Sequence, residues 1–479
     1  MRTIYERLRE YSKTDYYGFH MPGHKRQFNM LGAEAPYAID ITEIDGFDDL
    51  HHAAGIIRDA QVRAARVYQA DETHFLINGS SVGILSAVAG VAKRGDTVLV
   101  ARNCHKSVYH AVYMNGLRPV YLMPGFAPSV QLNTEVSAEA VREALEREPE
   151  IRAVIIVSPT YDGIVSDVEA IAEAVHDKGI PLIVDEAHGA HFGFHSYFPE
   201  NANAKGADIV IHSLHKTLPS LTQTALLHMN GGLVNRKRVR DYLHMLQSSS
   251  PSYVLMASID ACVDLLENRR EELFEPYVRM LMQTRKELRE LPRLCVVDME
   301  GNDPSKIIIS TKNANITGRR LYQRLLEKYH LQMEMAAGTY VLAMTSAGDT
   351  KEGMERLTGA LTDIDREIDS ARADESVRNA DIPCLPLPDV VYISSDMENI
   401  LDSLGSTRDE RRTECLLWKD SAGRVSAEYA YLYPPGSPLI VPGERVTQET
   451  IDVLQWYYER GYPIEGLRRV QYIEVLPEE

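Results

Sequence analysis

The sequence predicts an α/β protein with a mainly parallel sheet between two layers of helices. From about residue 60 to 230, short apolar runs alternate with helical patterns, and the clearest runs are residues 153–157, 180–184 and 207–212. Runs that are apolar throughout are typical of strands buried on both faces, as in parallel sheets. Helices between successive strands indicate βαβ connections. Because such sheets bind ligands at the carboxyl ends of their strands, we expect a functional site at that edge.

The elements of this region are separated by polar or glycine-containing turns. The strands carry β-branched residues, which favour a buried pleated surface, and one helical pattern stops near Gly179, a common kind of helix end. The first sixty residues show little periodicity and are interpreted as an N-terminal arm. In chain order, the predicted elements are a helix over 59–68, a strand over 74–77, a helix over 82–92, a strand over 96–101, a helix after 106, a strand over 153–157, a helix over 168–177, and strands over 180–184 and 207–212.

A smaller α+β domain is predicted beyond this region. Residues 255–290 are strongly helical and charged, and a Pro-rich stretch at 381–388 separates a C-terminal segment. Between them, the expected elements are strands over 305–311 and 339–345 and helices over 318–329 and 351–370. The chain is therefore divided into an N-terminal arm (1–60), a large domain (61–292), a small α+β domain (293–380) and a C-terminal segment (381–479).

The composition is that of a soluble enzyme. The 479 residues include 51 Lys plus Arg and 69 Asp plus Glu, which gives a net charge of −18. This charge argues against nucleic acid and anionic membranes as partners, and no apolar run is long enough to span a bilayer. The N-terminus has no signal-peptide pattern, and the five scattered cysteines form no disulfide framework or metal motif. We therefore expect a cytoplasmic protein without a metal site.

Two polar clusters follow the first two strands of the predicted sheet. Ser80 and Ser81 lie between a strand and a helix, where hydroxyls and backbone N–H groups can hold a phosphate; a plain serine helix cap is the alternative. His105 follows the strand that ends near Ala101. Its imidazole could stack on a planar ring, or it could be a solvated loop histidine.

Two further clusters follow the last two strands. Asp185 ends a buried strand, and an acid there is costly unless it is paired. Lys216 comes directly after another buried strand, where desolvation would lower its pKa and favour Schiff-base formation. A protonated pyridine nitrogen would pair with Asp185, while the spacing of the neighbouring histidines does not match a metal motif. Together the four clusters meet the requirements of pyridoxal 5′-phosphate (PLP).

At these residues the sequence resembles the bacterial ornithine/lysine/arginine decarboxylases, which have the PLP-dependent transferase fold of type I. The resemblance extends over nearly the whole chain and implies decarboxylation of a basic amino acid. The motifs that carry it are HMPGHK at 20–25, NCHKS at 103–107, SPTYDG at 158–163, DEAH at 185–188, SLHK at 213–216, YPPGSP at 433–438 and PGE at 442–444.

The resemblance implies a role for each matching side chain. Lys216 would form the Schiff base with the cofactor, Asp185 would pair with the pyridine nitrogen, and His105 would stack on the ring. Lys216 and His215 are both candidates for the acid that protonates the α-carbon. The other implied cofactor contacts are Ser80, Ser81, Ser213 and His215 at the phosphate, His188 near the ring hydroxyl, and Ser248, which would reach the phosphate from the neighbouring subunit.

The far end of a basic substrate needs a carboxylate. By the resemblance, Glu334 meets the distal cation, with Glu428 and Glu444 as weaker candidates. Tyr161 and Asp162 of the SPTYDG motif are interpreted as structural residues around the cofactor. The chain begins close to HMPGHK, so the resemblance favours a homodimer or tetramer of the short form, with active sites at the subunit interface, over a large ring assembled through an N-terminal wing domain.

The substrate remains open at this point. Arginine, giving agmatine in polyamine biosynthesis, is the first hypothesis, by analogy with short members of the family. Lysine, giving cadaverine, is the second, and ornithine, giving putrescine, is the third. An aminotransferase or another lyase on the same fold, and a non-catalytic regulator, are the alternatives of other classes. Retention of both Lys216 and Asp185 argues against a non-catalytic role.

Overall fold

A seven-stranded sheet forms the centre of the molecule in the computed structural model, which describes residues 14–19, 43, 47–299, 301–368, 383–404, 413–432 and 436–478. Neighbouring strands are parallel except at β10, which is antiparallel to both β2 and β9. The sheet is therefore mainly parallel, as predicted. In spatial order, its strands are β2 (Glu72–Leu76), β10 (Ala225–Met229), β9 (Ile209–Ser213), β8 (Leu182–Asp185), β7 (Ile151–Val157), β3 (Thr97–Ala101) and β4 (Arg118–Leu122).

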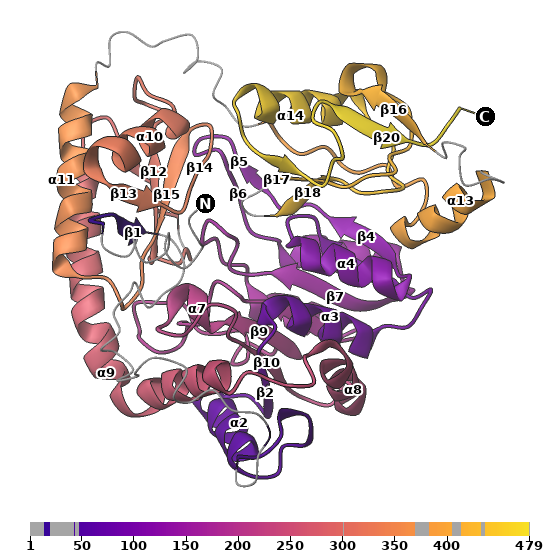
Figure 1. The fold of residues 1–479 in the computed structure, drawn as a ribbon, viewed down its shortest axis with the longest axis horizontal. Coiled ribbons are helices and arrows are strands. Elements are labelled where there is room, and N and C mark those ends of the chain that lie inside the picture. The colour runs from indigo at the N-terminus through magenta and orange to yellow at the C-terminus, as the bar shows by residue number, and fades with distance from the viewer. Residues whose placement is uncertain are drawn as a thin grey trace, which may run out of the picture.

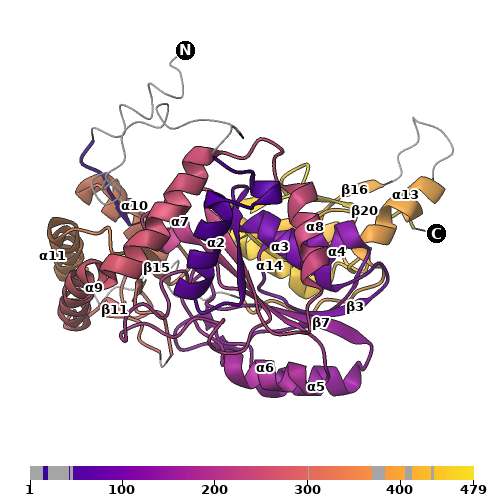
Figure 2. The same ribbon diagram turned by 90° about the horizontal axis from the view of Figure 1, so that it is seen from below.

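Helices cover both faces of this sheet (Figure 2). One face carries α3 (Gly79–Val91), α4 (Lys106–Asn115) and α8 (Arg236–Leu246), while α5 (Ala138–Arg147) and α6 (Val168–His176) lie on the other. Gly83 allows α3 to approach the sheet closely, since a Cβ at this position would lie 2.6 Å from Leu76 Cδ1. The prediction of a sheet between two helical layers is confirmed.

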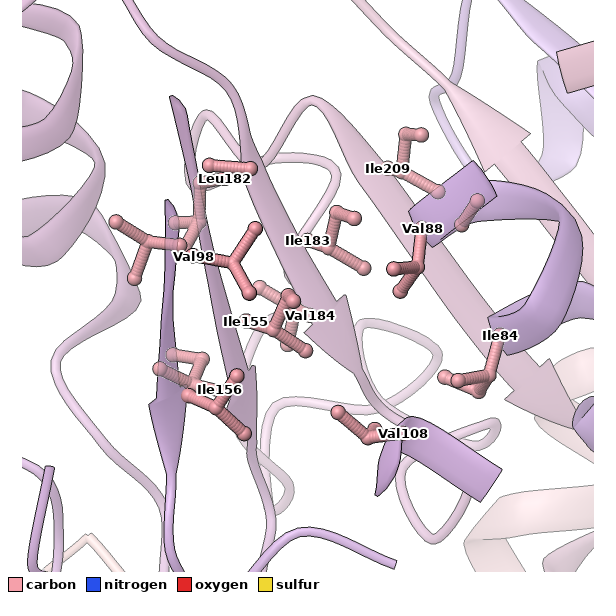
Figure 3. Close-up of a cluster of buried hydrophobic side chains, with 14 of the residues drawn as sticks. Ile84, Val88, Val98, Val108, Ile155, Ile156, Leu182, Ile183, Val184 and Ile209 are labelled. Atoms are coloured by element: carbon pink, nitrogen blue, oxygen red, sulfur yellow. The ribbon is translucent and has the colours of Figure 1, made fainter. Parts of the chain in front are cut away.

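The core of the large domain is an aliphatic cluster between the sheet and these helices (Figure 3). Burying each such side chain contributes about 1.5–3 kcal/mol, so the sheet is a rigid platform for the loops at its carboxyl edge. The cluster includes Ile84 and Val88 of α3, Val108 of α4, Val98 of β3, Ile155 and Ile156 of β7, Leu182, Ile183 and Val184 of β8, and Ile209 of β9.

A long helix, α9 (Tyr253–Arg289), leads from the large domain to a small α+β domain (Figure 1). The helix is kinked at Arg269, whose backbone is non-helical. The small domain contains a four-stranded antiparallel sheet in the order β11-β12-β15-β14. Its elements are β11 (Cys295–Val296), β12 (Lys306–Ser310), α10 (Gly318–Tyr329), β13 (Leu331–Met333), β14 (Met335–Ala336), β15 (Tyr340–Met344) and α11 (Lys351–Glu367).

Two parts of the predicted N-terminal arm have regular structure. β1 (Tyr17–Phe19) pairs in parallel with β13 of the small domain, and Tyr17 Oη donates a 2.7 Å hydrogen bond to Asp349 Oδ1. A short 3-10 helix, η3 (Leu50–His52), precedes α2 (Ile56–Val67), which begins inside the predicted arm. The arm is therefore partly built into the fold, through contacts distant in sequence that the local pattern does not contain.

The C-terminal segment has its own core around Trp418, Ile440 and Leu454, and we propose that it is a separate domain. It lies beside the large domain, and the small domain adjoins both (Figure 1). Its elements are η4 (Ser394–Asp396), α13 (Met397–Leu404), β16 (Glu414–Leu417), η5 (Trp418–Asp420), β17 (Ala430–Leu432), β18 (Ser437–Ile440), α14 (Gln448–Glu459), β19 (Ile464–Glu465) and β20 (Tyr472–Val475). The large domain also contains a short hairpin of β5 (Phe126–Ala127) and β6 (Leu132–Asn133). Among the described residues, no helix is long and apolar enough to cross a membrane.

Candidate active site

A cavity of about 340 Å³ opens at the carboxyl ends of β3, β7, β8 and β9. The structure places seven of the predicted site residues in its lining: Ser80, Ser81, His105, Asp185, His188, His215 and Lys216. These residues come from four different segments at the carboxyl ends of strands, as expected for a mainly parallel sheet whose strands end at one edge. Ser213 and Ser248 lie outside the lining of this cavity.

Lys216 is the amine of the cavity. It belongs to the short helix α7 (Leu214–Thr217), which follows β9 directly, and its Nζ lies 2.8 Å from His188 Nε2. Burial lowers the pKa of Lys216 to about 8, although the charges of Asp185 and Glu334 oppose this shift. A larger fraction of this amine than of an exposed lysine is therefore unprotonated near neutral pH, and the unprotonated form is the one that attacks a carbonyl carbon.

Asp185 is the acid at the end of β8. Its side chain is buried, and its Oδ1 accepts a 3.2 Å hydrogen bond from the Ala187 N–H. Burial raises the pKa of Asp185, while the charge of Lys216 opposes the rise. A cationic group bound in the cavity would stabilise the carboxylate, and a protonated pyridine nitrogen is such a group.

His105 supplies a flat, uncharged ring on the other side of the cavity. It is the N-cap residue of α4, and its Nδ1 accepts a hydrogen bond from the Ser107 N–H at 3.2 Å. Burial and the charge of Lys216 lower the pKa of His105 to about 3. The imidazole is therefore neutral at physiological pH and suited to stacking on a planar cofactor.

The N-terminus of α3 forms the anion-binding end of the cavity. Gly79 has a φ of +76°, and Ser80 and Ser81 lie in the first turn of this 13-residue helix. Asn78, the N-cap residue, makes no side-chain capping bond, so backbone N–H groups are available to an anion. Such a terminus fits the phosphate of PLP.

Two unsatisfied polar atoms support the fit to this cofactor. Within the part of the chain that the structure describes, His188 Nδ1 and Ser213 Oγ are buried and have no hydrogen-bond partner. Buried polar atoms normally have partners, and exceptions mark places where a ligand or water completes the bonding. His188 lines the cavity, while Ser213 lies at the end of β9, three residues before Lys216. The residues present therefore fit PLP.

A second cavity, of about 380 Å³, adjoins the first. The two share Asn103, Asn133, Tyr161, Asp162 and Ser437 in their linings. Glu334, directly after β13, lies in the second cavity. The Tyr161 hydroxyl donates a hydrogen bond to Glu334, and the Tyr161 ring lies 4.8 Å from the His188 ring. A continuous path thus runs from Lys216 past His188 and Tyr161 to Glu334.

The two weaker acid candidates have structural partners instead. Glu444 forms a buried bidentate salt bridge with Arg102, at 2.6 and 2.9 Å. Glu428 accepts backbone N–H bonds from Arg468 and Glu474, both at 2.9 Å. Neither side chain lines either cavity, so the assignment of both to the substrate is corrected. Their carboxylates hold the C-terminal domain together and, through Arg102, anchor it to β3.

Ser248 lies near the phosphate end of the cavity without lining it. Its side chain is exposed, and its N–H donates to Asn78 Oδ1 at 3.3 Å. The contact of Ser248 with the phosphate of a neighbouring subunit stays a prediction. Of the quoted motifs, HMPGHK at 20–25 lies outside the described residues, as do residues 433–435 of YPPGSP.

Sequence reasoning missed three polar residues at the junction of the two cavities. Asn103 follows β3, Ser437 begins β18, and Asp162 follows β7. Asp162 lies in the loop after β7, five residues past the end of that buried strand, whereas Asp185 is the last residue of β8. Its interpretation as a structural residue stays a prediction. Ser437 comes from a domain whose contacts the local sequence pattern does not reveal.

Comparison with known proteins identifies the family. The model of the Orn/Lys/Arg decarboxylase major domain matches residues 3–352, and that of the family's C-terminal domain matches residues 407–460. The chain belongs to the Orn/Lys/Arg decarboxylase family. It is thus a PLP-dependent amino-acid decarboxylase, as the resemblance predicted. The cavity around Lys216 is the place where this decarboxylase would hold its cofactor.

Two arginine decarboxylases are similar to this decarboxylase over nearly their whole length. An arginine decarboxylase from Bacillus anthracis is 34% identical, with 97% of this chain and 94% of the relative covered. An arginine decarboxylase from Bacillus subtilis (strain 168) is 32% identical, with 97% and 95% covered. The crystal structure of the Francisella novicida lysine decarboxylase LdcF superposes with a TM-score of 0.77 at 20% identity, over 90% of this chain and 73% of that one. This likeness confirms the predicted fold.

Proposed function

We propose that this decarboxylase converts L-arginine to agmatine and carbon dioxide. The observation that carries the proposal is the full-length similarity, at 32–34% identity, to proteins named arginine decarboxylases. The cavity beyond Lys216 supports it, because the Glu334 carboxylate is part of its lining and the cation of arginine lies at the far end of its side chain. Lysine and ornithine have the same charge pattern and are the alternative substrates.

We propose a separate role for each residue of the cavity. Lys216 binds the cofactor covalently, and Asp185 keeps the pyridine nitrogen protonated. His105 stacks on the ring, and His188 meets its hydroxyl. The phosphate contacts are assigned to Ser80, Ser81, Ser213 and His215. When bound, PLP supplies an electron sink for the pair left on the α-carbon as carbon dioxide departs.

Protonation of the α-carbon is assigned first to Lys216. Its pKa of about 8 lets Nζ hold a proton and release it near neutral pH. His188 Nε2 lies 2.8 Å away, and burial and the charge of Lys216 lower the pKa of His188, so its neutral ring can accept a hydrogen bond from Nζ. His215 is the second candidate, since its Nδ1 lies 2.9 Å from the Thr224 carbonyl oxygen, an acceptor that fixes the ring.

Substitution of Glu334 tests the proposed contact with the distal cation. We expect Glu334→Gln to raise KM for arginine about 10- to 100-fold, because a charge-assisted hydrogen bond contributes about 1.5–3 kcal/mol. The value of kcat should change less, since Glu334 is remote from the reacting carbon. Steady-state kinetics over a range of arginine concentrations measures both constants. An unchanged KM would remove Glu334 from the substrate site.

The active protein is proposed to be a cytoplasmic homo-oligomer, a dimer or a tetramer. Ser248 is exposed beside the N-cap of α3 and outside its own cavity, which supports a contact with a neighbouring subunit. Sedimentation of the PLP-loaded protein gives its mass. A monomer with full activity would contradict this assignment.

A competition assay tests the reaction itself. Purified, PLP-loaded protein receives arginine, lysine and ornithine together, each at a limiting concentration, and the amines are quantified. The proposal expects agmatine to form first, with carbon dioxide in equal amount. Cadaverine as the main product would show that lysine is the substrate, and putrescine would show that ornithine is. A keto acid formed with pyruvate would instead support an aminotransferase.

A further inference from the structure

Asp162 is a carboxylate at the junction of the two cavities that the proposed function leaves unused. It follows β7 and lines both cavities. Its Oδ1 accepts a 2.8 Å hydrogen bond from Tyr340 Oη of the small domain. A carboxylate can accept further hydrogen bonds, mainly through its second oxygen. Asp162 is therefore fixed in place and still able to bind a donor.

Among the described residues, no cation forms an ion pair with this carboxylate. The nearby Lys306 is buried in a 3.2 Å salt bridge with Asp303. An ionised carboxylate that is buried from water and has no cation beside it destabilises the folded protein. Burial accordingly raises the pKa of Asp162 to about 6, although Tyr340 and Lys306 oppose the rise. A cationic ligand at the junction would remove this cost.

We propose that Asp162 binds the distal guanidinium of the substrate together with Glu334. This inference rests on the proposed function and specifies its substrate class. Each acid is held by a tyrosine hydroxyl, Asp162 by Tyr340 and Glu334 by Tyr161. A guanidinium has five N–H donors in one plane and can engage two carboxylates, whereas an ammonium is a compact charge that one carboxylate can satisfy. Two fixed acids along one path therefore favour arginine over lysine.

Kinetics of Asp162→Asn provides the test, because asparagine keeps the acceptor for Tyr340 and removes the charge. We expect KM for arginine to rise about 10- to 100-fold with a smaller change in kcat, from the loss of one charge-assisted contact. The KM for lysine should rise by a smaller factor, so the preference for arginine falls. Calorimetry with agmatine, which carries the guanidinium but no carboxylate to lose, should show a similar rise in Kd.

Asp167→Asn is the matched control. Asp167 is an exposed acid five residues along the same segment that caps α6 through Ala170 N–H, and asparagine is an equally good cap. Its kinetics should equal those of the unsubstituted protein. Equal losses for arginine and lysine in Asp162→Asn, together with a lost visible cofactor band, would show a structural role and overturn the proposal. So would an unchanged arginine KM.

The pH profile gives a readout that a structural role would not change. Since the guanidinium binds the ionised carboxylate, KM for arginine should rise as pH falls through about 6, and Asp162→Asn should abolish that step. A step that persists in the variant would contradict the assignment. The titratable or charged groups that face Asp162 from neighbouring elements include Tyr340 of β15, Lys306 of β12, Tyr457 of α14, Arg319 of α10, Arg102 after β3, Tyr462 before β19, and Glu334, His188 and Lys216 along the cavities.

The assay separates failure of this inference from failure of the proposed function. If the unsubstituted protein releases no carbon dioxide from any basic amino acid, the proposed function fails. If it decarboxylates lysine in preference to arginine, the arginine assignment and the two-acid guanidinium site fail together. If it prefers arginine and Asp162→Asn behaves as Asp167→Asn does, only the role of Asp162 fails.

Discussion

Lys216→Ala should abolish the visible absorption of the PLP-loaded protein and lower kcat about 10⁴-fold or more, the scale seen when a catalytic nucleophile is removed. Lys216 is the amine that lines the cavity, and burial brings its pKa to about 8. Alanine leaves no nitrogen to bond the cofactor or to protonate the α-carbon. Absorption spectra and carbon dioxide release measure the two effects.

Lys178→Ala is the control for this substitution. Lys178 is exposed in the turn after α6, distant in the fold from the cavity lining. It should keep both the absorption band and the turnover. Decarboxylation by Lys216→Ala at the rate of the unsubstituted protein would show that another group carries the chemistry.

Asp185→Asn should lower kcat about 10²- to 10⁴-fold, because breaking a buried charge pair costs about 3–5 kcal/mol. Asparagine matches the shape of the aspartate but supplies no charge to hold a proton on the pyridine nitrogen. The ring then accepts electrons poorly, although it remains attached to Lys216. Single-turnover kinetics isolates this chemical step from substrate binding.

The spectrum distinguishes an electronic role from a failure to fold. The Asp185→Asn variant should bind PLP and keep a visible absorption band at a shifted wavelength. The control is Asp177→Asn, an exposed substitution at the end of α6, which should leave kcat unaltered. Full activity of Asp185→Asn would mean that the ring nitrogen needs no acid at this position.

The large domain was predictable because its signals are local. The buried strands β7, β8 and β9 contain the apolar runs 153–157, 182–184 and 209–211, and the polar residues that follow these runs mark one edge of the sheet. Two strands of the seven-stranded sheet escaped this reasoning. β4 is a partly exposed edge strand that contains Pro119, and β10 (ALLHM) lacks β-branched residues. Both are held as strands by pairing with neighbours.

The C-terminal domain was not predictable in the same way. Its strands are two to four residues long, too short to show a period. Its anchor, the pair of Arg102 and Glu444, joins positions 342 residues apart, so neither residue alone predicts the contact. For the same reason, Glu444 resembled a substrate acid in the sequence and proved to be a structural one.

Some residues of the candidate active site were predictable from local sequence signals, and others were not. Lys216, Asp185 and His105 could be found because each follows a strand of one sheet. The cavity beyond them is built from three domains, with Glu334 from the small domain and Ser437 from the C-terminal domain. Only the tertiary structure places Asp162 between these parts and beside Tyr340.

Peptide mapping of the reduced protein tests the central claim most directly. Borohydride reduction converts the carbon–nitrogen double bond between a lysine and the PLP aldehyde into a stable link, which survives proteolysis and mass spectrometry. We expect one modified peptide, with the cofactor on Lys216. A cofactor attached to Lys306 or Lys106 instead, or no attached cofactor at all, would contradict the account.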